Sequence, residues 1–438
     1  MEKREKEGGF TEKIQIYSEE CLRYCMYISA LPQEKYGGFT KLVYGNLTAS
    51  SRSLEDFLDF HGAKNNRDWC LYRELGATIR HISMAAYAQQ HILDRLASYG
   101  VSTDENFHAE CMKTLEFLDS VLVRAALLLI EEAKRLGVAP PRTPVGVDEV
   151  TSIQTSEMLE HNIDDEDEIP YQNRYIVKIS SEFLEIARDF EHYAFYEPCS
   201  YEEILDLVPG KVNEAEMQRF EVLIHNLQSS FDSYVIYGGY RLSKTRLKRM
   251  RSHFSVCFHL LQIINRLLHY YERHIRDRGF KDTYKKIQEI LCVKVVNPEE
   301  LLDRIVNFAL FHVNYFLVSG TRIAKNLLNE YVEQGTISVG IPMKLGFHSR
   351  PSLMVAKVVQ HYGGPVELLV GDACFDASSV LDIQWAGGKI QKEGIEKVSF
   401  RGDLRALKDI EILAGVNYGE DSMGKGIPLP KELSYLYR

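Results

Sequence analysis

The stretch GFHSRPSLMVAKVVQ, residues 346–360, places a glycine, a histidine, an arginine and a proline at the start of an amphipathic pattern. Its apolar residues recur at helical spacing and share one face, which predicts a helix over residues 349–362. Pro351 falls in the first turn, where the missing N–H of proline costs nothing. The pattern therefore places His348 at or near the N-cap of this helix.

A histidine at this position lies beside unpaired backbone N–H groups and the positive end of the helix dipole, which favour an anion. Arg350 adds a planar guanidinium suited to phosphate. The dipole also favours the neutral, nucleophilic imidazole. His348 is thus an ordinary helix start, a metal ligand or a phosphoryl acceptor. No second ligand at metal-binding spacing stands beside it, which disfavours the metal.

The sequence around this helix predicts a small α+β domain over residues 335–415. Strand-like runs alternate with helical ones in the order strand, helix, strand, strand, short helix, strand, helix. The expected strands include TISVGIPM, PVELLVG and EKVSFRG, and the expected helices are Ser349–Tyr362, Ser378–Trp385 and Leu404–Ala414.

The motif Gly346, Phe347, His348, Ser349, Arg350, Pro351 resembles HPr, the histidine-containing phosphocarrier of the bacterial phosphoenolpyruvate phosphotransferase system. The predicted element order also matches that family. The resemblance implies an open-faced sandwich, with a four-stranded antiparallel sheet and helices on one face. It implies that His348 is phosphorylated by phospho-Enzyme I and that Arg350 binds the phosphate. It covers less than a quarter of the chain.

A second landmark of the HPr family is a serine that opens the short middle helix and is phosphorylated by a kinase in some bacteria. Here the segment reads DASSVLDIQWAGG, in which Ser379 fits this position best and Ser378 is the alternative. The other interpretation is that the serine is only a helix N-cap.

The rest of the chain reads as helix, so we expect a multidomain protein with an all-α N-terminal region followed by the α+β domain. Proline, glycine and then an acidic run interrupt the helical pattern and predict a linker or long loop. A tail that the small carriers lack follows the last helix, and one hypothesis is that it packs on the helical region. The expected segments are helical residues 1–136, the linker 137–172, helical residues 173–334, the domain 335–415 and the tail 416–438.

Composition favours a cytoplasmic protein without a signal peptide. The net charge of −10 argues against non-specific nucleic-acid binding, and the basic run at 243–253 is interpreted as a solvated helix face. The most apolar stretches are too short to span a bilayer, so no membrane span is expected. The eight cysteines form no CxxC pair and are typical of reduced, buried thiols.

No metal or other cofactor is expected from the sequence. Cys21 and Cys25 lie four residues apart but have no further local ligand, so they are interpreted as core residues. His269 and His274 are five apart and no HExxH motif occurs, while His81 is interpreted as a satisfied or surface histidine.

These observations predict a bacterial phosphocarrier with a regulatory role, a phosphoprotein that carries a group rather than a turnover enzyme. His348 would accept a phosphoryl group from Enzyme I and pass it to an unknown acceptor or regulatory target. Phosphorylation would change how the helical region senses or binds a partner. The alternative is a non-catalytic helical interaction scaffold whose HPr-like domain serves only for docking. Permanent burial of His348 would favour that alternative.

Overall fold

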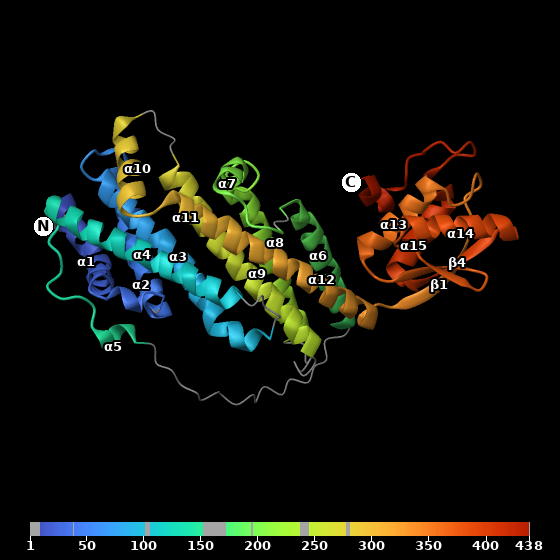
Figure 1. The fold of residues 1–438 in the computed structure, drawn as a ribbon, viewed down its shortest axis with the longest axis horizontal. Coiled ribbons are helices and arrows are strands. Elements are labelled where there is room, and N and C mark those ends of the chain that lie inside the picture. Colours follow the sequence, from blue (N-terminus) through green and yellow to red (C-terminus); the bar gives the residue numbers. More distant parts are fainter. Residues whose placement is uncertain are drawn as a thin grey trace, which may run out of the picture. The chain divides into compact units, whose positions relative to one another are not determined.

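The computed structural model describes residues 9–37, 39–100, 106–151, 172–193, 196–236, 245–276 and 281–437. This part of the chain is mostly helical and ends in a small domain with a four-stranded antiparallel sheet (Figure 1). The expected acidic run at 158–170 lies outside the described residues.

Contacts between residues divide the chain into two compact units. The first unit contains residues 1–164, 190–225 and 252–317, and the second contains 165–189, 226–251 and 318–438. Residues 172–189 therefore pack with the C-terminal part of the chain, although the sequence assigned them to the linker and the second helical region.

The first four long helices form a bundle in which α1 and α3 each pack against both α2 and α4. Their bounds are α1 Phe10–Ser29, α2 Lys41–Phe60, α3 Cys70–Tyr99 and α4 Phe107–Arg135. Apolar side chains from all four are removed from water, among them Leu22, Leu47, Ile79 and Leu122. Cys21 and Cys25 lie fully buried in this core, so their interpretation as core cysteines is confirmed.

Further helices follow along the chain, and several continue through wider π-helical turns. The helices are α5 Val147–Val150, α6 Gln172–Phe190, α7 Tyr201–Leu207, α8 Glu214–Phe231, α9 Thr245–Tyr270, α10 Asp282–Lys294, α11 Pro298–Asp303 and α12 Phe311–Tyr331. The π-helical turns are η4 Asp232–Ile236, η5 Tyr271–Ile275 and η6 Arg304–Leu310. Short 3₁₀ turns are η1 Gln33–Lys35, η2 Ala63–Asn65 and η3 Glu191–Tyr193.

One continuous helical stretch among the described residues, Pro298–Tyr331, is long and apolar enough to cross a membrane. Of its most apolar window, 72% is buried within the protein. The core helix of a globular protein has the same length and composition, so this stretch is weak support for a membrane span.

The C-terminal domain has the element order that the sequence predicted. Its elements are β1 Gln334–Gly340, α13 Ser349–Tyr362, β2 Val366–Val370, β3 Ala373–Asp376, α14 Val380–Glu393, β4 Lys397–Asp403 and α15 Leu404–Gly415. The strands pair antiparallel in the order β1-β4-β2-β3. Phe400 of β4 lies opposite Ile337 of β1 on one side and Leu368 of β2 on the other.

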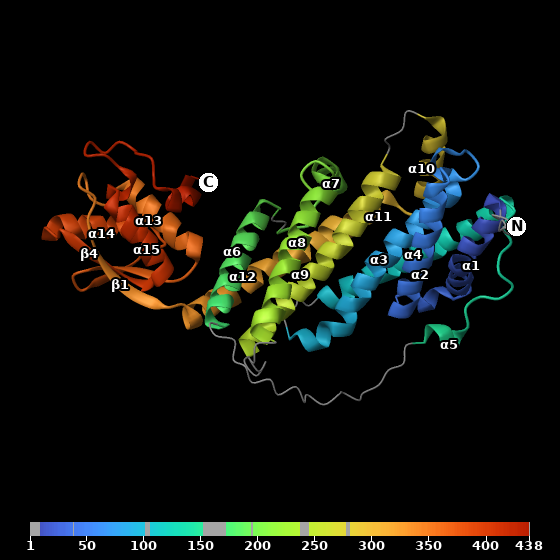
Figure 2. The same cartoon turned by 180° about the vertical axis from the view of Figure 1, so that it is seen from behind.

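The three helices of this domain cover one face of the sheet (Figures 1 and 2). In β2, Val366, Leu368 and Val370 are buried while the residues between them are only partly buried or exposed. These side chains share one core with apolar residues of α13, α14 and α15. Alternate side chains of the strands thus pack against the helix faces on which apolar residues recur every 3.6 residues.

The middle helix is longer than the sequence predicted, because α14 continues beyond Trp385 to Glu393. The sequence placed its end near the pair Gly387 and Gly388. A Cβ atom at Gly387 would lie 3.0 Å from the backbone oxygen of Phe347. A glycine here allows the helix to approach the loop before His348, which compensates for its low helix propensity.

The C-terminal tail packs on the α+β domain, which corrects the expectation that it packs on the helical region. Its 3₁₀ turns, η7 Asn417–Gly419 and η8 Lys431–Tyr437, bring Tyr418, Leu433 and Leu436 into the core of that domain. The Tyr435 hydroxyl donates a hydrogen bond to Asp409 at 2.7 Å. The tail is therefore a fixed part of this domain.

Candidate functional site

The loop before His348 is shaped by two successive left-handed residues, Leu345 with φ of 62° and Gly346 with φ of 57°. Glycine adopts this conformation without cost, whereas leucine adopts it under strain. The loop is fixed by Phe347, whose buried ring meets that of Tyr418 edge to face at 5.2 Å. The backbone thus turns sharply into α13 and presents the next side chain outward.

His348 is the N-cap residue of α13, as the sequence predicted. Its side chain makes no capping hydrogen bond, and its carbonyl accepts the first helical bond, from Ser352 N–H at 3.1 Å. The N–H groups of Ser349 and Arg350 have no acceptor within the helix, and Pro351 has no N–H. The imidazole therefore lies beside two backbone donors that favour an anion.

Glu420 of the tail contacts the two residues of the predicted motif. Its carboxylate lies 3.0 Å from His348 Nε2 through one oxygen and 3.5 Å from Arg350 Nη1 through the other. The Glu420 side chain is only 1% exposed, while His348 remains 29% exposed and Arg350 46%. The site is therefore a His–Glu–Arg cluster whose carboxylate is buried and whose imidazole is open on one side.

A second run of strained backbone positions Glu420. Asn417 and Tyr418 both have left-handed dihedrals, with φ of 49° and 57°. The Asn417 side chain accepts a hydrogen bond from Met343 N–H and donates one to the carbonyl of Glu420. The Tyr418 hydroxyl donates to Gly340 O at 2.7 Å, and burial raises its pKa, so it stays a neutral donor. The tail turn and the His348 loop are thus tied together.

The contact with Glu420 sets the tautomer of His348. An ionised carboxylate only accepts hydrogen bonds, so Nε2 carries the proton that it donates to Glu420. The lone pair is then on Nδ1 in the neutral ring. Within the described residues, no hydrogen bond of the protein engages Nδ1. Nδ1 is therefore the ring nitrogen that is left for an external group.

Exposed apolar side chains accompany this cluster. Met343 and Leu345 precede His348 in its loop, and both are exposed. The Lys344 ammonium donates to the carbonyl of Met423, which places that exposed tail residue beside the same loop. Methionine is enriched at interfaces between proteins. The rim of the site is therefore suited to contact with another protein.

Ser379 is the N-cap residue of α14, which confirms the structural interpretation of this serine. Its hydroxyl accepts from Asp382 N–H at 3.2 Å and donates to the Asp382 carboxylate at 3.2 Å. The backbone N–H of Ser378 donates to Asp376. Phosphorylation at Ser379 would bring a phosphate against the Asp382 carboxylate, and it remains a prediction.

Other features suggested by the sequence lie away from this cluster. A pocket of 620 Å³ lies at the opposite end of α13, where His361 and Tyr362 meet residues of α6 and α15.

In the basic run, Arg246 pairs with Glu330 at 3.0 Å and Arg251 pairs with Asp232 through two hydrogen bonds. These ion pairs reduce the positive charge that the run offers to a nucleic acid.

Sequence reasoning found His348, Arg350, Gly346 and Pro351 but missed Glu420. The first four stand within six residues, whereas Glu420 reaches the site only through the fold of the tail. The segment NYGEDSMGKG, with its glycines and acidic residues, signals a turn but not a contact.

Comparison with known proteins adds no relative: no family model, no curated protein and no solved structure matches this chain. The class that the fold and site define is a helical protein with a C-terminal α+β domain bearing a partly exposed histidine at a helix start.

Proposed function

We propose that this protein is an HPr-like phosphocarrier with a regulatory role, and that His348 accepts a phosphoryl group from phospho-Enzyme I. The observation that carries the proposal is the cluster at the start of α13. It combines a partly exposed imidazole whose Nδ1 has no protein partner, a neighbouring guanidinium, and the two first-turn N–H groups that have no acceptor within the helix. The element order strand, helix, strand, strand, helix, strand, helix supports the resemblance to HPr.

The step is a transfer of one phosphoryl group. Nδ1 attacks phosphorus, a P–N bond forms, and the bond from phosphorus to the donor's leaving atom breaks. Positive charge develops on the ring as its lone pair is used. Glu420 accepts the Nε2 hydrogen bond at 3.0 Å, so its carboxylate stabilises that charge as it appears. The N–H groups of the first helical turn and Arg350 are the donors for the phosphate oxygens.

The partner in this step is a protein, and the rim of the site suits one. The exposed apolar residues beside His348 are Met343, Leu345 and Met423. Such residues suit a protein that brings its phosphoryl group to the imidazole. Their flexible, apolar side chains can pack against a donor without a deep pocket.

The test is phosphoryl transfer with the full-length protein. Phosphoenolpyruvate and Enzyme I are added, and acid-labile, alkali-stable phosphate on the protein is followed over time. We expect label on wild type and none on His348→Ala. His108→Ala, which removes an exposed histidine of α4, should label like wild type.

Label that survives in His348→Ala would refute the assignment of the accepting residue. If wild type takes no label while Enzyme I phosphorylates an ordinary HPr in the same mixture, the carrier function is refuted. The helical scaffold with a docking domain would then be the better interpretation, because Glu420 would act only as a structural partner of His348.

A further inference from the structure

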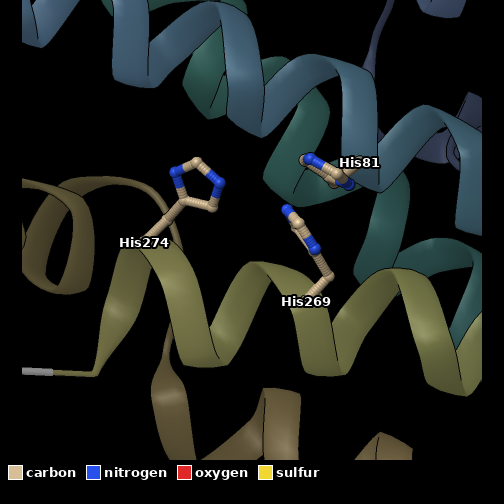
Figure 3. Close-up of side chains that lie close together, drawn as sticks. All are labelled: His81, His269 and His274. Atoms are coloured by element: carbon tan, nitrogen blue, oxygen red, sulfur yellow. The ribbon is translucent and has the colours of Figure 1, made fainter. Parts of the chain in front are cut away.

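A second histidine cluster lies in the helical unit, separate from the proposed carrier site. His81 of α3, His269 of α9 and His274 of η5 each offer a ring nitrogen, and these atoms lie within 4.8 Å of one another. Figure 3 shows the three rings gathered in the space between α3 and the end of α9. Imidazole nitrogens are common zinc ligands, and three of them gathered from two helices could bind one ion.

Two of the rings are held by carboxylates. His269 Nδ1 lies 2.8 Å from Glu214 Oε1, and His274 Nδ1 lies 2.5 Å from Glu74 Oε2. Because a carboxylate accepts a hydrogen bond, each Nδ1 carries a proton and the lone pair of each ring is on Nε2. A carboxylate behind the imidazole is the arrangement that fixes and strengthens metal-binding histidines.

The third ring is buried with an unused nitrogen. His81 is 3% exposed, and its Nδ1 atom is buried without a hydrogen-bond partner. A buried ring nitrogen without a partner loses the hydrogen bond that it makes in water, unless its lone pair binds a ligand.

We propose that His81, His269 and His274 bind one divalent transition-metal ion of the zinc class. Three imidazole nitrogen donors suit zinc and its neighbours, whereas calcium and magnesium require oxygen ligands. Glu74 and Glu214 supply negative charge behind two of the ligands. The ring centroids of His81 and His269 are 4.3 Å apart and the rings stack. To converge on one ion, the two rings would turn about their side-chain bonds.

Such an ion would join α3 to the end of α9 within the first unit. Three protein ligands leave a fourth position for water or an external group, which is typical of zinc sites that bind or activate a ligand. The inference is independent of the carrier function, since all five residues belong to the helical unit and none contacts His348.

The test uses the full-length protein, stripped with a chelator and titrated with Zn²⁺ alone in calorimetry and in competition with a metallochromic indicator. We expect one equivalent of tightly bound Zn²⁺, and with Co²⁺ the intense visible bands of a tetrahedral site. His81→Gln and His274→Gln should each abolish both signals. Glu214→Gln should weaken Zn²⁺ binding about 10- to 100-fold, because it removes the carboxylate behind His269.

The matched control is His91→Gln. His91 also stacks on a second histidine, His259, at 4.1 Å, but the Lys41 ammonium lies 3.2 Å from its Nδ1. We expect Zn²⁺ binding of this variant to equal that of wild type. The proposal is overturned if folded wild type binds no Zn²⁺ or Co²⁺. It is also overturned if His81→Gln and Glu214→Gln, folded by circular dichroism, bind Zn²⁺ as tightly as wild type.

Discussion

Replacing Glu420 tests whether the tail takes part in the chemistry of His348. The Glu420 side chain is buried, lies 3.0 Å from His348 Nε2 and 3.5 Å from Arg350 Nη1. Glu420→Gln keeps an oxygen that accepts from Nε2–H but removes the negative charge. Glu420→Ala removes both. We expect both variants to take up phosphate more slowly than wild type, the alanine variant more so.

The magnitude follows from the geometry. A hydrogen bond to a charged group is worth about 1.5–3 kcal/mol, and each 1.36 kcal/mol in a barrier changes the rate tenfold. The interaction strengthens as the ring gains positive charge. It therefore stabilises the transition state more than the ground state and lowers the barrier. Phosphorylation by phospho-Enzyme I should therefore slow roughly 10-fold in Glu420→Gln and roughly 100-fold in Glu420→Ala.

The assay is rapid-quench measurement of the first turnover, with saturating phospho-Enzyme I and full-length protein. Glu432→Gln is the matched control, because Glu432 is an exposed glutamate of the same tail, and its rate should equal that of wild type. Faster labelling of Glu420→Ala would refute the reasoning, since the carboxylate would then act as a plug that repels the incoming phosphate. Unchanged rates would show that the contact is only structural.

Four further substitutions probe the domain and the bundle. Arg350→Ala should lower the steady-state level of phosphohistidine about tenfold in the same labelling assay, because a charge-assisted donor to phosphate is lost. Gly346→Ala should cost about 1 kcal/mol of unfolding free energy in urea, because φ is 57° there, whereas Gly388→Ala, in the exposed interior of α14, should gain about 0.5–1 kcal/mol. Burial raises the pKa of Asp119 to about 7, against about 3.9 in the unfolded chain. The native state thus holds a proton that the unfolded state loses, so the contribution of Asp119 to stability should fall by the order of 4 kcal/mol as the pH rises from about 4 to 7. Asp119→Asn should show a flatter profile in urea melts across that range.

The sequence predicted the parts of the fold that depend on local pattern. The start of α13 and the placement of His348 at its N-cap follow from spacing and from Pro351, and both are confirmed. The predicted end of α14 near Trp385 was wrong, because the helix continues through Gly387 and Gly388 to Glu393. The close approach of Phe347 to Gly387, which makes the glycine favourable, is a tertiary contact that no local window contains.

Both clusters contain members that sequence reasoning could not bring together. Glu420 stands in a tail whose turn depends on left-handed Asn417 and Tyr418. The side chains of these two residues are held by hydrogen bonds with backbone groups of a distant segment, Met343 N–H and Gly340 O. His81 is far along the chain from His269 and His274. The local sequence around each histidine does not show that the three rings come together. Contacts between separate helices, not residue types, define these sites.

The contacts of Arg350 with the tail link phosphorylation of His348 to the conformation of that tail. In the unphosphorylated protein its guanidinium donates to Gly424 O at 3.1 Å and lies near Glu420, both in the tail. A phosphate on Nδ1 of His348 would offer stronger acceptors for the same guanidinium. Arg350 would then turn from the tail toward the phosphate, and the phosphate charge would lie near the buried carboxylate. On the proposed function, phosphorylation therefore loosens the turn between Glu420 and Gly426, and hydrogen exchange of the amides in this turn should rise in the phosphorylated protein.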